Sequence, residues 1–174
     1  KDYNKTISLN PKHAQAYYYR GGIKFENGDY KAAIIDFSQA INLKPDNAYA
    51  YNDRGSSKRM TDDLDGAIAD YTKATQLDAK IPFVFNNLGS AKRKKKEYKG
   101  AIEAYSQAIK LKPNYPIAYN NRGYAKFDSE DYQGAIDDFT TAITQNPEYA
   151  YAYNNRAAAK IKLKDYKGAI EDEN

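Results

Sequence analysis

A sequence pattern of 34 residues repeats along this chain without a gap. Steps of 34 residues from Pro147 lead in turn to Pro113, Ala79, Pro45 and Pro11. One complete unit covers residues 116–149 and reads PIAYNNRGYAKFDSEDYQGAIDDFTTAITQNPEY. A fixed period of this length predicts a stack in which each unit packs mainly against its neighbours, without a single globular centre.

Each unit carries two helical patterns separated by a polar break. Aromatic, small and apolar residues recur at three- and four-residue spacing from Tyr119 to Phe127, and again from Tyr132 to Ile143. The polar stretch 128–131 marks the turn between them, and Asn146-Pro147 ends the second helix. Each unit is therefore predicted to be a helical hairpin, and the fold class to be all-α.

The period also predicts the organisation of the whole chain. Residues 1–13 match the end of a unit, and residues 150–174 match a unit that stops within its second helix. We expect a single repeat array over residues 1–174, and we favour its being a piece of a longer array. The full units are predicted at 14–47, 48–81, 82–115 and 116–149.

The unit resembles the tetratricopeptide repeat, and the resemblance covers the whole chain. Local departures occur at Ala79, at residues 61–64 and at Lys96. The resemblance implies a right-handed α-solenoid superhelix of helix-turn-helix repeats that binds other proteins and does no chemistry. The positions that carry it in the first full unit are Tyr17, Gly21, Gly28, Tyr30, Ala33, Phe37, Ala40 and Pro45.

One correlation between positions predicts ion pairs inside the hairpins. An arginine recurs at one position of the first helix, and an aspartate follows it by sixteen residues in every unit except 82–115, where the two residues are Leu88 and Ala104. We predict a structural bridge between the two helices of the same unit, with coincidence as the alternative. The predicted pairs are Arg20 with Asp36, Arg54 with Asp70, Arg122 with Asp138, and Arg156 with Asp172.

The opposite side of the first helices is predicted to line a concave groove that binds a peptide. Asparagine is a poor helix former, so its recurrence on one face needs a reason, and its amide can both donate to and accept from an extended backbone. Solvated asparagines, or asparagines bonded between helices, are the alternative. The two rows are Asn52, Asn86, Asn120 and Asn154, and then Asn87, Asn121 and Asn155.

Aromatic and basic side chains complete the predicted groove. Tyrosine offers a large contact area at a small cost in conformational entropy. Packing at the junctions between units is the alternative, which we expect for Tyr115 and Tyr149 and consider for Tyr49 and Tyr151. The remaining predicted groove residues are Tyr18, Tyr19, Phe83, Tyr124, Phe127, Arg59 and Arg93.

Charge is segregated between neighbouring units. Unit 82–115 has eight basic and two acidic residues and a net charge of +6, whereas unit 116–149 has two basic and six acidic residues and a net charge of −4. The basic run 92–96 is suited to an acidic partner or to nucleic-acid phosphates. The alternative is a solvated helix end favoured by the helix dipole.

The sequence predicts no enzyme, no metal site and no cofactor. It has no cysteine, and its single histidine, His13, falls in a loop without a catalytic companion. No apolar run approaches the roughly 20 residues that span a bilayer, so we expect a soluble chain without membrane insertion, with the cytoplasm slightly favoured.

The leading hypothesis is a protein–protein interaction scaffold that holds a partner peptide of unknown identity in its groove. Two alternatives remain open at this stage. Exposed stacking faces at the two ends could join copies head to tail. The basic run 92–96 could bind an acidic partner or nucleic acid, of which nucleic acid is the less favoured partner.

Overall fold

The computed structural model describes residues 2–173, and every regular element in this part of the chain is an α-helix. The predicted all-α class is therefore confirmed. The helices are α1 (Tyr3–Leu9), α2 (Ala14–Glu26), α3 (Tyr30–Leu43), α4 (Ala48–Met60), α5 (Leu64–Leu77), α6 (Pro82–Lys94), α7 (Tyr98–Leu111), α8 (Pro116–Asp128), α9 (Tyr132–Gln145), α10 (Ala150–Lys162) and α11 (Tyr166–Glu173).

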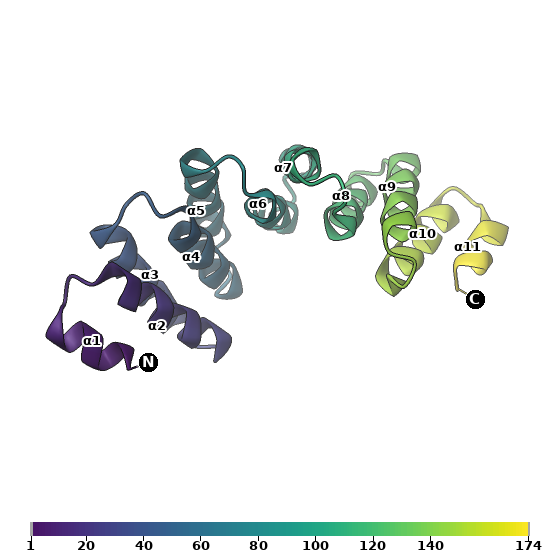
Figure 1. Cartoon of the computed structure of the whole chain (residues 1–174). Helices are drawn as coiled ribbons and strands as arrows, with labels where there is room; N and C mark the ends of the chain where they lie inside the picture. The colour runs from purple at the N-terminus through teal and green to yellow at the C-terminus, as the bar shows by residue number, and fades with distance from the viewer. Residues whose placement is uncertain (1, 174) are drawn as a thin grey trace. The chain divides into compact units, whose positions relative to one another are not determined.

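Within each of two parts of the chain, successive helices pack as antiparallel neighbours (Figure 1). By its internal contacts the chain divides into two compact units, residues 1–87 and residues 88–174. In the first unit α2 packs against α3, α3 against α4, and α4 against α5. In the second unit the same order runs from α7 through α8, α9 and α10 to α11.

Aspartates determine where most of the second helices begin. Asp29, Asp63 and Asp131 are N-caps whose carboxylates accept a hydrogen bond from the backbone N–H three residues later. Such a bond satisfies one of the free N–H groups of the first turn. Glu97 takes this position before α7 and makes no side-chain capping bond.

The turn inside each hairpin keeps one conformation despite a varied sequence. The residue before the cap adopts a left-handed backbone conformation, which ends the preceding helix. Only the first hairpin has glycine at this position, so the departures at Lys96 and at residues 61–64 leave the turn unchanged. The φ angles are 81° at Gly28, 66° at Asp62, 63° at Lys96, 68° at Glu130 and 64° at Lys164.

The core of four hairpins contains a close contact between a glycine of the first helix, Gly21, Gly55, Gly89 or Gly123, and an aromatic ring of the second. A Cβ atom at Gly21 would lie 2.9 Å from Phe37 Cδ1, and one at Gly123 would lie 2.8 Å from Phe139 Cε1. Both rings are fully buried. The first helix therefore approaches the ring of the second helix at a distance that only glycine permits.

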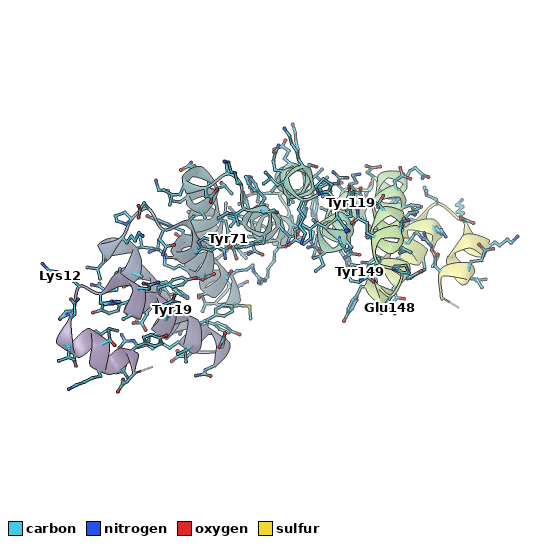
Figure 2. All side chains as sticks on the ribbon, in the orientation of Figure 1. Lys12, Tyr19, Tyr71, Tyr119, Glu148 and Tyr149 are labelled. Atoms are coloured by element: carbon cyan, nitrogen blue, oxygen red, sulfur yellow. The ribbon has the colours of Figure 1, made fainter. Side chains whose placement is uncertain are left out.

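Alanines and aromatic side chains extend this core between hairpins. In the first unit Val84 joins a buried cluster with Ala48 and Ala74, against which Tyr51 packs. Tyr71, fully buried, and Tyr19, 43% exposed, illustrate the contrast between packed and surface tyrosines (Figure 2). α6 begins at Pro82, whose fixed φ suits the first turn of a helix.

Candidate functional site

The four predicted ion pairs lie between the two helices of their hairpins, with the aspartates buried. Arg20, Arg54 and Arg122 each place Nη2 2.7 Å from the carboxylate of the aspartate sixteen residues later, and Arg156 pairs in the same way with Asp172. The aspartate side chains are 2–5% exposed, whereas the arginine side chains are 17–25% exposed. These residues hold the two helices of a hairpin together and are structural.

A lysine that sequence reasoning did not assign completes each pair. Lys24 Nζ lies 2.7 Å from Asp36 Oδ2, and Lys126 Nζ lies 2.9 Å from Asp138 Oδ2. Burial alone would raise the pKa of Asp36, but the hydrogen bonds and charges of Arg20 and Lys24 outweigh it and lower that pKa below its ordinary value. The recurrence of this lysine four residues after each arginine was the available signal.

Each arginine also reaches the preceding repeat. Arg54 Nη1 donates to Ser38 Oγ at 3.1 Å, and Arg122 Nη1 donates to Ser106 Oγ at 3.0 Å. The guanidinium group therefore joins three helices, two of its own hairpin and one of the hairpin before. The other two contacts of this kind are Arg20 to Asn4 and Arg156 to Thr140.

The structure corrects the prediction for three of the four asparagines in the first row. Asn52, Asn86 and Asn120 are only 4%, 8% and 7% exposed, so a peptide on the surface does not reach them. Asn87 Nδ2 donates to Asn52 Oδ1 at 3.0 Å, and Asn155 Nδ2 donates to Asn120 Oδ1 at 3.0 Å. The amide that the sequence assigned to a ligand is thus bonded to the amide 35 residues later in the next repeat.

The asparagines of the second row are half-buried, and one asparagine of the first row is exposed to solvent. Asn87, Asn121 and Asn155 lie at intermediate exposure, while Asn154 is exposed. The reason is that the next first helix covers an asparagine of the first row, and no such helix follows α10 in the described chain. The alternative of asparagines bonded between helices therefore describes Asn52 and Asn120.

A different network occupies this position between α2 and α4. The Tyr18 hydroxyl donates to Asp53 Oδ2 at 2.7 Å, and Asn52 Nδ2 donates to Asp53 Oδ1 at 2.9 Å. Burial raises the pKa of both Tyr18 and Asp53, and the negative charge of Asp53 raises that of Tyr18 further. Tyr18 is half-buried.

Exposed rings lie one turn before the asparagines. Tyr49 is 50% exposed and Phe83 37% exposed, and their centroids are 6.1 Å apart in a tilted arrangement. In the second unit Tyr151, at the position of Tyr49, is 73% exposed. Tyr49 and Tyr151 are therefore surface residues, so junction packing does not describe them.

The other two tyrosines considered for the junctions are partly buried. Tyr149 packs against the cluster formed by Ala142, Ile143 and Ala152. Burial raises the pKa of Tyr115 and of Tyr149. Both are packing residues, as the sequence led us to expect.

Arg93 is engaged within the protein. Its Nη1 donates to Asp128 Oδ2 at 3.0 Å, and its guanidinium carbon lies 4.3 Å from the centroid of the Tyr124 ring. Arg93 was predicted to face a ligand with a free charge, and the acidic side chain of the next repeat compensates that charge instead. Tyr124 remains 37% exposed, whereas Phe127 packs edge-on against Tyr132 with centroids 5.4 Å apart.

Arg59 and the basic run have a mixed environment. Burial raises the pKa of Tyr71, and Arg59 lies close enough to the Tyr71 hydroxyl to oppose that rise. Lys94, Lys95 and Lys96 are exposed at the end of α6. Lys95 Nζ lies 3.3 Å from Glu97 Oε1, so part of the positive charge is compensated locally.

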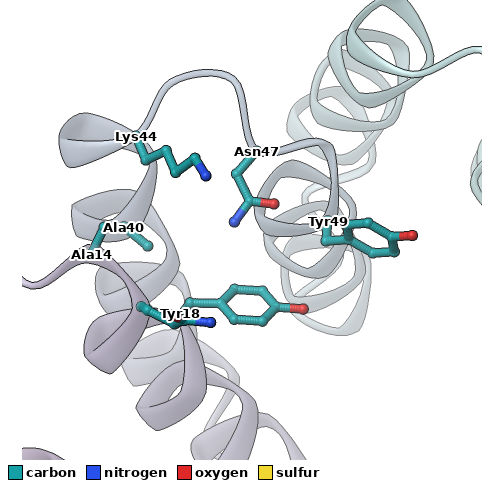
Figure 3. A pocket seen from close by; sticks show the side chains of 7 residues that line it. Ala14, Tyr18, Ala40, Lys44, Asn47 and Tyr49 are labelled. Atoms are coloured by element: carbon teal, nitrogen blue, oxygen red, sulfur yellow. The ribbon is translucent and has the colours of Figure 1, made fainter.

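A cavity of about 370 Å³ lies beside Tyr49 (Figure 3). Tyr18 forms its floor on the α2 side, and Lys44 and Asn47 project over it from the loop between α3 and α4 (Figure 3). The remaining lining residues are Ala14, Gln15 and Ala40. The site thus combines two tyrosine rings with one cation and the amides of Gln15 and Asn47, a mixture typical of small recognition sites.

No group of acidic, histidine or cysteine side chains within residues 2–173 has the arrangement of a metal site. His13 serves as the N-cap of α2, and its Nδ1 accepts a hydrogen bond from the Ala16 backbone N–H at 3.1 Å. Among the described helices, none has both the length and the apolar character needed to cross a bilayer.

Comparison with protein-family models identifies the class. A model described as TPR repeat matches residues 21–57 and 89–129, and three models described as tetratricopeptide repeat match residues 2–35, 48–81 and 116–149. The chain belongs to the tetratricopeptide repeat family. No curated protein matches its sequence.

Solved structures share this fold. YrrB, described as a TPR protein with an unusual peptide-binding site, superposes with a TM-score of 0.82 at 20% identity, over 99% of this chain and 89% of that chain. MamA gives 0.79 at 26% identity, over 88% and 94% of the two chains. The pilF protein of Pseudomonas aeruginosa gives 0.81 at 20% identity, over 91% and 72%.

Proposed function

We propose that this chain is a non-catalytic protein-interaction scaffold and that its first unit binds an extended peptide segment of a partner. The binding face is formed by α2, α4 and the beginning of α6. The observation that carries the proposal is the pair of exposed rings Tyr49 and Phe83, of which Tyr49 lines the 370 Å³ cavity. Rings of this kind bury a large area at small entropic cost when a partner covers them.

The polar groups around the cavity suit a peptide. Lys44 is exposed and can pair with a carboxylate, and the half-buried Asn47 carries an amide that can bond a peptide backbone. Asn47 Oδ1 caps α4 by accepting a hydrogen bond from the Ala50 N–H at 3.3 Å, which leaves its amide nitrogen as the donor toward the cavity. Tyr18 is held by Asp53, so its ring presents a fixed wall. A preformed wall lowers the entropic cost of binding.

The likeness to solved structures supports the same proposal. YrrB is described as having a peptide-binding site, and this chain shares its fold over nearly its whole length. The absence of catalysis is proposed from the histidine, which serves as a helix cap, and from aspartates whose recurring roles are capping and pairing within hairpins. The histidine and these aspartates therefore stabilise the helices and the hairpins.

The test is selection of peptides from a random 12-residue display library on the immobilised chain, followed by affinity measurement. The double variant Tyr49→Ser/Phe83→Ser should bind the selected peptides roughly thirtyfold more weakly, because loss of two aromatic anchors costs on the order of 2 kcal/mol. The matched control is Leu9→Ser/Ile35→Ser, which removes two apolar side chains that are 74% and 68% exposed elsewhere in the first unit.

Equal loss in both double variants, or no loss in either, would show that the ring pair is not the binding site. Two side measurements separate the other functions. Light scattering over a range of protein concentrations reports self-association, and a salt-dependent mobility shift with generic RNA reports binding through residues 92–96.

A further inference from the structure

Gly22 on α2 is a glycine that packing does not require. A Cβ atom placed on it would meet nothing within 4 Å, whereas one placed on the neighbouring Gly21 would lie 2.9 Å from Phe37. Glycine inside a helix costs about 1 kcal/mol relative to alanine. The empty space beside Gly22 therefore exists at a cost that the hairpin itself does not explain.

This space is a cavity of about 190 Å³ between α2 and α4. Its apolar lining comes from Phe25 and Phe37, and its polar lining comes from Glu26, Asp53 and Ser56. The two hydrogen bonds to Asp53 come from neutral groups, the Tyr18 hydroxyl and the Asn52 amide. The carboxylate is thus partly buried without a cation bonded to it, and burial raises its pKa.

Among the repeats, glycine and a carboxylate occur together at these two positions only here. The position of Gly22 is occupied in the later repeats by Ser56, Ser90, Tyr124 and Ala158. The position of Asp53 is occupied by Tyr19, Asn87, Asn121 and Asn155. In the second unit the position of Gly22 is taken by Tyr124, and the guanidinium carbon of Arg93, a cation that the protein itself provides, lies 4.3 Å from the centroid of the Tyr124 ring.

We propose that the cavity beside Gly22 receives an arginine side chain of the bound partner. This inference rests on the proposed function and names a residue that the peptide carries. A guanidinium group is planar and weakly hydrated, so it can lie against the phenylalanine rings while its N–H groups reach carboxylates on two helices. Glu26 and Asp53 supply those carboxylates from α2 and α4.

The test uses N-acetyl-arginine amide as a probe and N-acetyl-citrulline amide as its neutral isostere. Amide NMR spectra of the intact chain are recorded during titration with each compound. The backbone signals of Gly22 and Ser56 should shift and saturate with the arginine probe, and the citrulline probe should bind at least about tenfold more weakly because the charge-assisted bonds are lost.

Two variants copy side chains from other repeats and so keep the fold. Gly22→Tyr introduces the residue found at Tyr124 and should abolish the saturable shifts by filling the cavity. Asp53→Asn introduces the residue found at Asn155 and should weaken binding of the arginine probe at least about tenfold. Equal binding of both probes, or unchanged binding in Asp53→Asn, would overturn the inference.

The two experiments distinguish failure of the arginine pocket from failure of the proposed peptide-binding face. Suppose that peptide binding depends on Tyr49 and Phe83, whereas the arginine probe does not shift the Gly22 signal. This result would reject the arginine pocket and keep the proposed binding face. Peptides that bind independently of the two rings would reject the proposed face, whatever the probe does.

Discussion

Two neighbouring repeats reach the same hairpin with opposite chemistry. In residues 116–149 the guanidinium of Arg122 pairs with the buried carboxylate of Asp138 and lies 5.5 Å from the Tyr119 ring centroid. In residues 82–115 the positions equivalent to Arg122 and Asp138 are occupied by Leu88 and Ala104, which are 8% and 6% exposed. The fold therefore accepts either an ion pair or two apolar side chains at this position.

The comparison shows what an ion pair contributes here. Desolvation of two charges offsets much of their attraction, so a buried pair and a well-packed apolar pair can be of similar stability. What the pair adds is geometric selection, because a guanidinium group bonded to two hairpins tolerates few alternative packings. Arg122 reaches both Asp138 and Ser106, whereas a leucine has no directed bond to either helix.

Removal of only one partner of an ion pair should reduce the stability of the protein most. Arg122→Leu alone should destabilise the protein by about 3 kcal/mol, because it leaves Asp138 buried with Lys126 as its remaining cation. The double variant Arg122→Leu/Asp138→Ala copies Leu88 and Ala104 and should lie within about 1 kcal/mol of the native chain. Urea unfolding followed by circular dichroism measures both, and a double variant as unstable as the single would refute the equivalence.

A smaller effect should be common to both repeats. Gly89→Ala places a Cβ 2.7 Å from Tyr105 Cε1, and Gly123→Ala places one 2.8 Å from Phe139 Cε1. Each should cost about 1–3 kcal/mol by overpacking, whether or not an ion pair is present. Gly22→Ala serves as the control and should gain about 0.5–1 kcal/mol, because no atom lies near the new methyl group. Thermal unfolding would show the contrast, and a neutral Gly123→Ala would contradict it.

The smallest effect should be on the loss of stability at low pH. The pKa of Asp36 is lowered in the folded protein, so its ionised form contributes stability that is present above the ordinary carboxyl pKa, about 4, and is lost as the pH falls toward the folded value. Arg20→Leu/Asp36→Ala should therefore lose less stability between pH 7 and pH 3 than the native chain. Urea midpoints at the two pH values provide the measurement, and parallel losses would show that this pair carries no linkage.

Sequence reasoning was most successful for positions whose partners lie in the same repeat. The spacing of sixteen residues between Arg54 and Asp70 and the joint change at Leu88 and Ala104 pointed to a contact that the structure contains. The two positions belong to one hairpin, whose geometry follows from the helix period and a short turn. Helix periodicity and turn length are therefore sufficient to predict contacts within one hairpin.

The groove residues were harder to predict because their environment depends on the neighbouring repeat. Asn52 and Tyr49 lie on the same side of α4, one turn apart, yet Asn52 is buried against Asn87 and Tyr49 is half exposed. Periodicity assigns a residue to a face of its own helix. It does not state how much of that face the next first helix will cover.

The all-α hairpins and the ion pairs within them follow from the amino-acid sequence alone. The tertiary structure decided which polar groups remain available to a partner: it covered Asn120 with Asn155, compensated Arg93 with Asp128, and left a cavity beside Gly22. The physical reason is that hydrogen bonds within a helical turn are set by local geometry, whereas exposure is set by side chains 35 residues away that pack against the same helix.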